Sequence, residues 1–228
     1  FGIKNNWSKL IEHQASKELA DTANLKRVLA ATLNTYHDTD RPVIIDKGRG
    51  WTSMLEMLEW VTDEEAKVLV PVRGIPQILS SLEKLHRKRV ATGQQDGDYI
   101  NGQTVEGRTS QQLLNSSVLG LAFDRLKDAM HRGYGDRLHF VEFDDLTHNP
   151  QQKMEEVYSF LGLAPFNHNF QSVEQYTHED DSVHGGLDLH TIRKEVRPVQ
   201  DDSATILGAE IVTQYSGAEF WRSNPNQK

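Results

Sequence analysis

The chain has 228 residues, a net charge of −8 at pH 7 and no cysteine. Its length suffices for one sizeable hydrophobic core, so we expect a single domain over residues 1–228. The acidic charge disfavours a sequence-independent nucleic-acid partner. The lack of cysteine excludes disulfides and thiolate catalysis and fits a cytoplasmic protein. No apolar run is long enough to cross a membrane, and no secretory signal is visible.

The first part of the chain predicts two helices, a short strand and a basic loop. Apolar residues recur at helical spacing within residues 4–37, where we expect the two helices. Residues 43–46 begin with Val-Ile-Ile and predict a buried strand, which runs into Asp-Lys-Gly-Arg-Gly. In this loop Lys47 and Arg49 stand beside glycines, which let the backbone approach an anion while two cations face it. A solvated basic turn is the alternative interpretation.

The next strand and helix place an arginine and a serine at one edge of the predicted sheet. Residues 68–72 are a β-branched and apolar run that predicts a strand buried on both faces. Arg73 ends this strand, Pro76 fits the first turn of a helix, and Ser81 lies further along that helix. Ligands of open α/β sheets bind beyond the carboxyl ends of the strands, and an Arg and a hydroxyl placed there can share one phosphate. The alternative is a surface arginine and a mid-helix serine without a ligand.

A long aperiodic segment follows. Residues 87–110 start with a basic run and are then rich in Gly, Gln and Asp. A loop of this length in a compact domain is usually a lid, a binding loop or a disordered segment. We interpret residues 87–110 as a lid-like insertion and expect residues 91–107 to form a mobile, substrate-facing lid. Disorder is the alternative.

The second half of the chain predicts one more strand between helices. Helical spacing of apolar residues predicts a long helix over residues 109–132 and a last helix over residues 203–216. Between them, residues 138–143 predict a third strand, and Pro150 opens a helix of its own.

The stretch from Arg73 to Ser81 resembles the 3′-phosphate motif of sulfotransferases that use 3′-phosphoadenosine 5′-phosphosulfate (PAPS). That motif is an Arg at the end of a strand, a Pro shortly after it, and a Ser eight residues beyond the Arg. The resemblance implies that Arg73 and Ser81 hold the 3′-phosphate of the nucleotide.

A second stretch is similar to another recurrent part of this family, in which a strand ends in Tyr-Glu-Asp-Leu and a Pro, a helix and Phe-Leu-Gly follow. Here the sequence runs Val-Glu-Phe-Asp-Asp-Leu-Thr-His-Asn-Pro, then a helix, then Phe-Leu-Gly-Leu. Phe143 and Asp144 replace the Tyr and Glu. This block implies structural roles, and no catalytic role is assigned to it.

The family also offers a counterpart for the basic loop. There the strand corresponding to residues 43–46 is followed by a Lys, often with a catalytic His two residues later. Lys47 matches the Lys, whereas Arg49 stands where the His is expected. The resemblance places Lys47 beside the transferred sulfuryl group, makes Arg49 a second candidate cation, and leaves the general base unassigned.

A late loop completes the resemblance. The stretch from His184 to Lys194 looks like the basic, glycine-containing loop with which sulfotransferases close over the nucleotide. It implies nucleotide contacts for four residues: Gly185, Gly186, Arg193 and Lys194. For the general base we rank His190 and His184 first, because a histidine titrates near neutral pH. The histidine spacings within residues 164–200 are not those of a metal site, so no metal is expected.

The resemblance implies an α/β fold of three layers with a mostly parallel sheet of the P-loop nucleotide-binding kind. Family members hold the 5′-phosphosulfate in a Gly/Ser/Thr-rich turn after the first strand. The given sequence begins with Phe1-Gly2-Ile3-Lys4 and shows no such turn before the strand predicted for residues 43–46. We therefore expect the domain to be N-terminally incomplete. Either this loop is encoded upstream of Phe1, or the chain is a partial domain without activity.

The function inferred at this point is transfer of a sulfuryl group from PAPS to a hydroxyl or amine of a small-molecule or peptide acceptor of unknown identity. Such a transfer spreads negative charge over the moving group and needs positioning, cations and a base. One alternative is a nucleotide-phosphate kinase on a related fold. Another is a non-catalytic module that binds a nucleotide or a protein partner.

Overall fold

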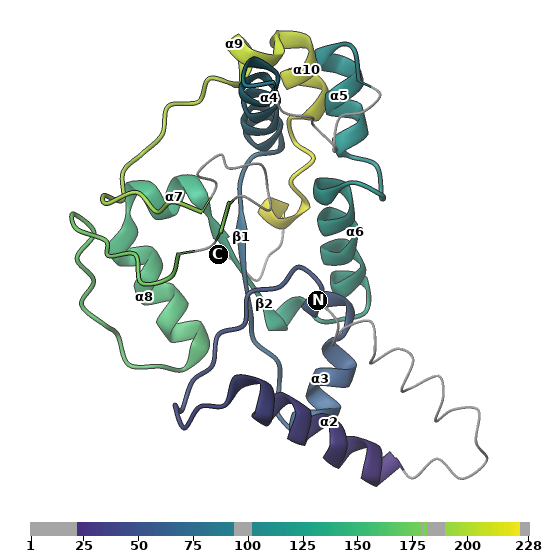
Figure 1. Cartoon of the computed structure of the whole chain (residues 1–228), viewed down its shortest axis with the longest axis vertical. Helices are drawn as coiled ribbons and strands as arrows, with labels where there is room; N and C mark the ends of the chain where they lie inside the picture. The colour runs from purple at the N-terminus through teal and green to yellow at the C-terminus, as the bar shows by residue number, and fades with distance from the viewer. Residues whose placement is uncertain (1–21, 94–101, 179, 182–189, 224–228) are drawn as a thin grey trace. The chain divides into compact units, whose positions relative to one another are not determined.

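The computed structural model describes residues 22–93, 102–178, 180–181 and 190–223. The chain divides into two compact units, Phe1–Ala66 and Lys67–Lys228. Figure 1 shows the course of the chain through both units. None of the helices in the described residues is long and apolar enough to span a membrane.

The first unit is built on two packed helices. Leu29 and Val61 are buried against each other, one from each helix, and further apolar side chains pack around them. Of the two helices predicted within residues 4–37, the second is present, whereas the first lies outside the described residues. The elements of this unit are α2 (Thr22–His37), the 3-10 helix η1 (Trp51–Ser53) and α3 (Leu55–Thr62).

The strand predicted for residues 43–46 is wrong, because these residues form neither a strand nor a helix. Val43, Ile44 and Ile45 are 42%, 47% and 75% exposed. A strand exists only through hydrogen bonds to a neighbouring strand, and the described residues give this segment no such ladder. A β-branched apolar run was therefore not a sufficient signal.

The second unit contains a small parallel sheet. Strands β1 (Val68–Val72) and β2 (Leu138–Glu142) are hydrogen-bonded in register, with Val68 opposite Leu138 and Val72 opposite Glu142. Both strands therefore end at the same edge, where Arg73 and Phe143 follow them. The predicted parallel α/β arrangement is confirmed for these two strands, the only ones among the described residues.

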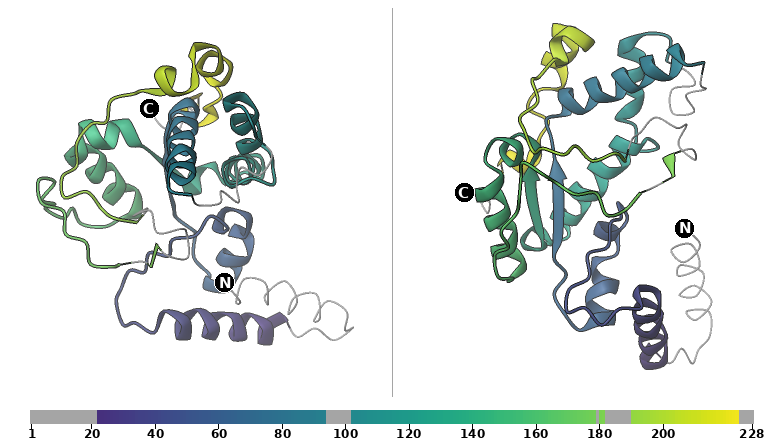
Figure 2. Two further views of the ribbon diagram at one scale, coloured as in Figure 1. Left: turned by 45° about the horizontal axis from the view of Figure 1, so that its top comes forward. Right: turned by 60° about the vertical axis from the view of Figure 1, so that its left-hand side comes forward.

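Helices lie on both sides of this sheet. Figures 1 and 2 show α7 and α8 on one side and α6 on the other. In α8 the sequence provides both ends, since Pro150 stands in the first turn and Gly162 ends the helix with a φ of 73°. The bounds are α4 Ile75–Ala91, α5 Val105–Gln112, α6 Val118–His131, η3 Gly135–Arg137, α7 Phe143–His148, α8 Pro150–Leu161, α9 Ser203–Leu207, α10 Ala209–Tyr215 and η5 Phe220–Ser223.

Two helices that were predicted as continuous are each divided. The predicted helix over residues 109–132 contains the end of α5 and the whole of α6, whose cap Ser117 accepts a hydrogen bond from the Gly120 N–H at 3.1 Å. The predicted helix over residues 203–216 is divided at Gly208, whose φ of 91° favours glycine. The cap at Ser117 and the positive φ of Gly208 interrupt the helices, although the apolar side chains keep their helical spacing through both points.

The predicted lid-like insertion over residues 87–110 is helical at both ends. Helix α4 continues to Ala91, and α5 begins at Val105 with Thr104 as its cap. The Thr104 hydroxyl accepts a hydrogen bond from the Gly107 N–H at 3.0 Å. Residues 94–101 lie outside the described residues, so a lid remains a prediction for that part of the chain.

Candidate functional site

The structure brings Arg73 and Ser81 together at the carboxyl edge of the sheet. Arg73 is the first residue after β1, and Ser81 lies two turns into α4 on the side that faces back toward the strand. The Nη1 atom of Arg73 donates a long hydrogen bond of 3.4 Å to the Ser81 hydroxyl. The predicted spacing thus corresponds to a real contact between a guanidinium and a hydroxyl.

The Arg73 guanidinium is held in place from β2 and still has donor capacity. Its Cζ atom lies 4.6 Å from the centre of the Phe143 ring, the first residue after β2, within the range of a cation–π contact. Its Nε atom is buried and has no hydrogen-bond partner among the described residues. A buried, unsatisfied guanidinium N–H is costly unless an anion receives it. The chemistry of this group therefore fits a phosphate ligand.

A polar contact ties the turn after β1 to the turn after β2. Gln77, in the first turns of α4, donates from Nε2 to the Asp144 carboxylate at 3.0 Å. Its Oε1 atom is buried without a partner in the described part of the chain. Phe143 and Asp144 thus have contacts to the candidate anion site, which the sequence did not indicate because both were treated as structural replacements for Tyr and Glu.

Helix α4 is fixed on a second side by Asp202, the cap residue of α9, whose neighbour Asp201 bonds Ser203 within α9. Asp202 accepts hydrogen bonds from Ser80 at 2.9 Å and from Lys84 at 2.8 and 3.0 Å. Hydrogen bonds from Ser203, with a smaller contribution from the positive charge of Arg73, hold the pKa of the Asp201 carboxyl below its ordinary value. Asp201 therefore stays ionised within the field of the candidate anion site.

A buried ion cluster holds the middle of α4. Glu83 is 1% exposed, and its carboxylate accepts two hydrogen bonds of 2.8 Å from Arg108 of α5 and one of 2.8 Å from Arg87. Arg108 also donates to the Gly102 carbonyl at 3.0 Å. Burial raises the pKa of the Glu83 carboxyl, but the hydrogen bonds and charges of the two arginines outweigh it and the net pKa is lowered.

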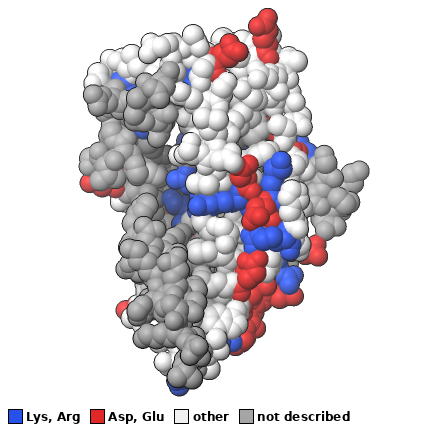
Figure 3. All heavy atoms as spheres, turned by 90° about the vertical axis from the view of Figure 1, so that its right-hand side faces the viewer, with Lys and Arg blue, Asp and Glu red and all other residues white. Residues whose placement is uncertain are grey.

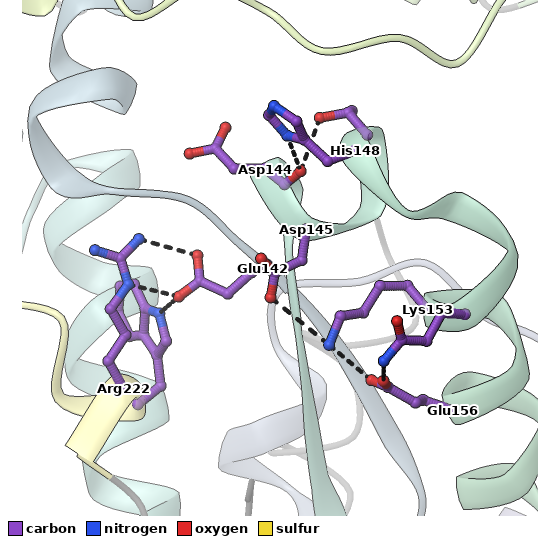
Figure 4. A network of polar contacts seen from close by, with 10 residues as sticks. Glu142, Asp144, Asp145, His148, Lys153, Glu156 and Arg222 are labelled. Carbon is purple, nitrogen blue, oxygen red and sulfur yellow. Dashed lines mark hydrogen bonds and ion pairs between the residues drawn. The ribbon is translucent and has the colours of Figure 1, made fainter.

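Figure 4 shows the charged groups at the end of β2. Arg222 pairs with the Glu142 carboxylate through two hydrogen bonds of 2.7 and 3.0 Å, and Trp221 donates to the same carboxylate at 2.9 Å. Burial raises the pKa of Glu142, but the Arg222 and Trp221 hydrogen bonds outweigh it and hold the pKa below its ordinary value. On α8, Lys153 lies between Glu156 at 2.8 Å and Asp145 at 3.6 Å.

The basic loop of the first unit is anchored by Asp46. One carboxylate oxygen of Asp46 accepts a 2.8 Å hydrogen bond from the Trp51 indole, and the other lies 3.9 Å from Nε2 of His37. Lys47 and Arg49 follow and are exposed. No sequence pattern indicated His37, because it stands at the end of a predicted helix and a turn separates it from Asp46. Because His37 lies beside Asp46, and Lys47 follows Asp46 directly, His37 is a candidate general base.

His190 of the late loop pairs with a carboxylate, Asp181, that precedes this loop in the chain. Nδ1 of His190 lies 2.5 Å from one oxygen of Asp181, and the His190 backbone N–H donates to the other at 3.2 Å. A carboxylate at one ring nitrogen fixes the orientation and tautomer of the imidazole. Nothing in the sequence marked Asp181, since a carboxylate in a loop rich in acidic residues carries no distinguishing pattern. His184, Gly185 and Gly186 lie outside the described residues.

The basic pair of this loop is exposed on a backbone that is held by two hydrogen bonds. The Val173 N–H donates to the Lys194 carbonyl at 2.7 Å, and the Val196 N–H donates to the Phe170 carbonyl at 2.9 Å. Arg193 and Lys194 are both exposed. Their nucleotide contacts remain predictions.

The described surface in Figure 3 carries acidic and basic side chains next to one another. Ion pairs such as that of Arg132 with Asp128, at 2.8 Å, are of this kind. Mixed charges on this face produce no extended field of one sign.

The arrangement defines an α/β protein with a candidate anion-binding edge, and comparison with known proteins identifies its family. A family model described as a sulfotransferase domain matches residues 9–194. No curated protein and no solved structure matches the chain significantly. Because the family model spans well over half of the chain, the chain belongs to the sulfotransferase domain family. The resemblance inferred from the Arg73 motif and from the block that ends in Phe-Leu-Gly-Leu, at Leu163, is thus confirmed.

Proposed function

We propose that this protein transfers a sulfuryl group from PAPS to a hydroxyl or amine of an acceptor. The observation that supports this best is the Arg73–Ser81 contact at the end of a parallel strand, with a buried Arg73 Nε that lacks a partner among the described residues. Both residues fall within the part of the chain that matches the sulfotransferase domain. A doubly charged 3′-phosphate supplies the acceptor oxygens that these donors lack.

In the proposed reaction each group has a chemical task. Bound PAPS supplies the sulfuryl group, and transfer breaks the bond between sulfur and the bridging oxygen while a new S–O or S–N bond forms to the acceptor. Lys47 and Arg49 are the candidate cations for the charge that develops on the bridging oxygen. A base, with His190 as first candidate and His184 as second, takes the proton of the acceptor. Gly185, Gly186, Arg193 and Lys194 are proposed to close over the nucleotide.

Arg73→Ala is expected to weaken the binding of adenosine 3′,5′-bisphosphate by about 1.5–3 kcal/mol, the range for hydrogen bonds to charged groups. Isothermal titration calorimetry measures this loss. Adenosine 5′-monophosphate, which lacks the 3′-phosphate, should bind wild type and Arg73→Ala with nearly equal affinity. Ser81→Ala should give a smaller loss in the same direction, because a neutral hydroxyl contributes less than a guanidinium.

Lys88→Ala is the matched control, since Lys88 is an exposed cation in the last turn of the same helix. It should leave the affinity unchanged. Unchanged bisphosphate affinity in folded Arg73→Ala would remove the 3′-phosphate assignment. Tight bisphosphate binding without any sulfuryl transfer by the full-length gene product would instead favour the non-catalytic module.

His190→Gln is expected to lower the sulfuryl-transfer rate roughly 10²-fold and to remove the acidic limb of the pH–rate profile, because a general base acts only when deprotonated. Asp181→Asn should lower the rate less, since it leaves the imidazole in place but changes the group that orients it. Single-turnover measurements between pH 5 and 9 report both effects.

The competing base is His37, and the comparison of His37→Gln with His190→Gln decides between them. Loss of the acidic limb in His37→Gln alone would transfer the role to the histidine beside Asp46. An unchanged profile in both variants would exclude both residues as the base.

A further inference from the structure

The segment Glu219–Arg222, here called the C-terminal clamp, lies against the carboxyl ends of both strands. Figure 1 shows this yellow segment returning from α10 to the sheet. It lies beyond residues 9–194, the part of the chain that matches the sulfotransferase domain. The clamp is therefore a feature of this chain that the family comparison does not include.

Buried aromatic packing anchors the clamp at the end of β2. Trp221 is 3% exposed and stacks on Phe140 of β2 with ring centres 6.3 Å apart. Phe123 of α6 contacts the rings of Phe220 and Trp221 at 5.3 and 6.2 Å. Together with the two Arg222 hydrogen bonds to Glu142, these contacts fix the clamp relative to the sheet.

From this anchor the clamp reaches the start of α4. One oxygen of the Glu219 carboxylate accepts a 2.8 Å hydrogen bond from the Ile75 N–H, 144 residues earlier in the chain. Ile75 is 1% exposed and Glu219 is 5% exposed, so water does not replace this bond. The helix cap residue is Gly74, which has no side chain with which to cap. Glu219 therefore supplies the cap that the local sequence lacks.

The location of this bond connects it to the anion site. Ile75 stands two residues after Arg73, and the glycine between them is the most permissive residue for backbone rotation. Gly74 is itself closely surrounded, since an added Cβ would lie 3.1 Å from Gln77 Oε1 and 3.6 Å from Glu219 Oε1. Holding Ile75 thus holds the angle between β1 and α4, on which the Arg73–Ser81 contact depends.

We propose that Glu219 is a positioning residue for the Arg73–Ser81 phosphate site and that the C-terminal clamp is part of the donor-binding half of this protein. The proposal rests on the proposed function, because its ligand is the 3′-phosphate of the donor. Glu219 touches no ligand in this scheme. Glu219 holds the Ile75 N–H and thereby fixes the Arg73 guanidinium relative to the Ser81 hydroxyl.

The test compares Glu219→Ala with Glu219→Gln by calorimetry, using adenosine 3′,5′-bisphosphate and adenosine 5′-monophosphate. Glu219→Ala is expected to weaken bisphosphate binding about tenfold and to change monophosphate binding less than about twofold. Glu219→Gln keeps an oxygen that can accept the Ile75 N–H bond, so its bisphosphate affinity should stay within about threefold of wild type. Glu210→Ala, an exposed carboxylate in the first turn of α10, is the control and should change nothing.

A double-mutant cycle then separates positioning from general stability. In the Arg73→Ala background, Glu219→Ala should weaken bisphosphate binding less than about twofold further, because the group that it positions is gone. Arg222→Gln removes the hydrogen bonds that hold the clamp at Glu142 and also the 4.0 Å ion pair between Arg222 and Glu219, while the Glu219 carboxylate itself is kept. This variant should also lose bisphosphate affinity more than monophosphate affinity. This variant tests the proposal if Glu219→Ala does not fold.

The outcomes are distinguishable. A wild-type protein that binds no bisphosphate overturns the proposed function and this proposal together. If Arg73→Ala weakens bisphosphate binding but Glu219→Ala and Arg222→Gln do not, only the role of the clamp is wrong. Equal losses for the two nucleotides, or an undiminished effect of Glu219→Ala in the Arg73→Ala background, would show a general folding effect instead.

Discussion

Lys47→Met is expected to lower the sulfuryl-transfer rate by about 10²–10³-fold, the effect of losing one preorganised group that stabilises developing charge. The affinity for PAPS should fall much less. The physical reason is that the bridging oxygen gains charge as the sulfuryl group leaves, so the ammonium serves the transition state more than the resting complex. Single-turnover transfer by the full-length gene product, with donor affinity measured separately, provides the two numbers.

The alternative for Lys47 is an exposed lysine in a basic turn, which predicts less than about a twofold change in either quantity. Lys127→Met, at an exposed position on α6, is the matched control for loss of a lysine charge. Wild-type turnover in Lys47→Met would remove this residue from the mechanism. Arg49→Met would then be the next variant to measure, because Arg49 is the second cation of the same loop.

Glu83→Ala is expected to destabilise the protein by about 3–5 kcal/mol, the cost of removing one partner of a buried ion pair. Glu83 is 1% exposed and Arg108 is 9% exposed, so the variant leaves a largely buried guanidinium without this carboxylate. This loss is a large fraction of the roughly 5–15 kcal/mol by which domains are stable. Urea denaturation followed by circular dichroism measures it.

Asp128→Ala is the matched control for this variant. Asp128 also pairs with an arginine at 2.8 Å, but its side chain is 59% exposed, so the expected cost is below about 1 kcal/mol. Replacing both partners of the buried pair, in Glu83→Leu/Arg108→Leu, should recover part of the stability because no buried charge is then left alone. A cost below about 1 kcal/mol for Glu83→Ala would contradict the structural role of the cluster.

The lowered pKa of Glu83 also predicts the direction of the pH dependence. The folded-state pKa lies below the ordinary value, so the ionised carboxylate stabilises the fold at every pH above the ordinary carboxyl range. This stabilisation is lost as the pH falls through the folded-state pKa. The stability difference between wild type and Glu83→Ala should therefore be constant near neutral pH and shrink in acid.

The sequence was sufficient to predict elements whose signal is local. The bounds of β1 were predicted as observed, because an unbroken β-branched and apolar run lies between Lys67 and Arg73. The predicted burial of both faces was wrong, since Pro71 is exposed and Leu69 is only partly buried. The contact of Arg73 with Ser81 followed from the strand end and the pitch of α4. The breaks at Ser117 and Gly208 were missed, since their cap and their left-handed φ act inside otherwise periodic stretches.

Tertiary structure decided the rest, because partners far apart in the chain cannot be read from periodicity. Residues 43–46 have the composition of a strand but no ladder among the described residues. Glu83 stands in a charged helix, and only the approach of Arg108 from α5 makes it a buried ion partner.

The candidate site also has a part that the sequence determined and a part that only the fold decided. By itself, the sequence determined the family and the two residues proposed to hold the phosphate, since a strand end and a helical pitch bring Arg73 and Ser81 into contact. Only the fold decided what supports them. Phe143 reaches Arg73 because β2 is the parallel neighbour of β1, and Glu219 reaches Ile75 because aromatic packing of Trp221 returns the end of the chain to that edge.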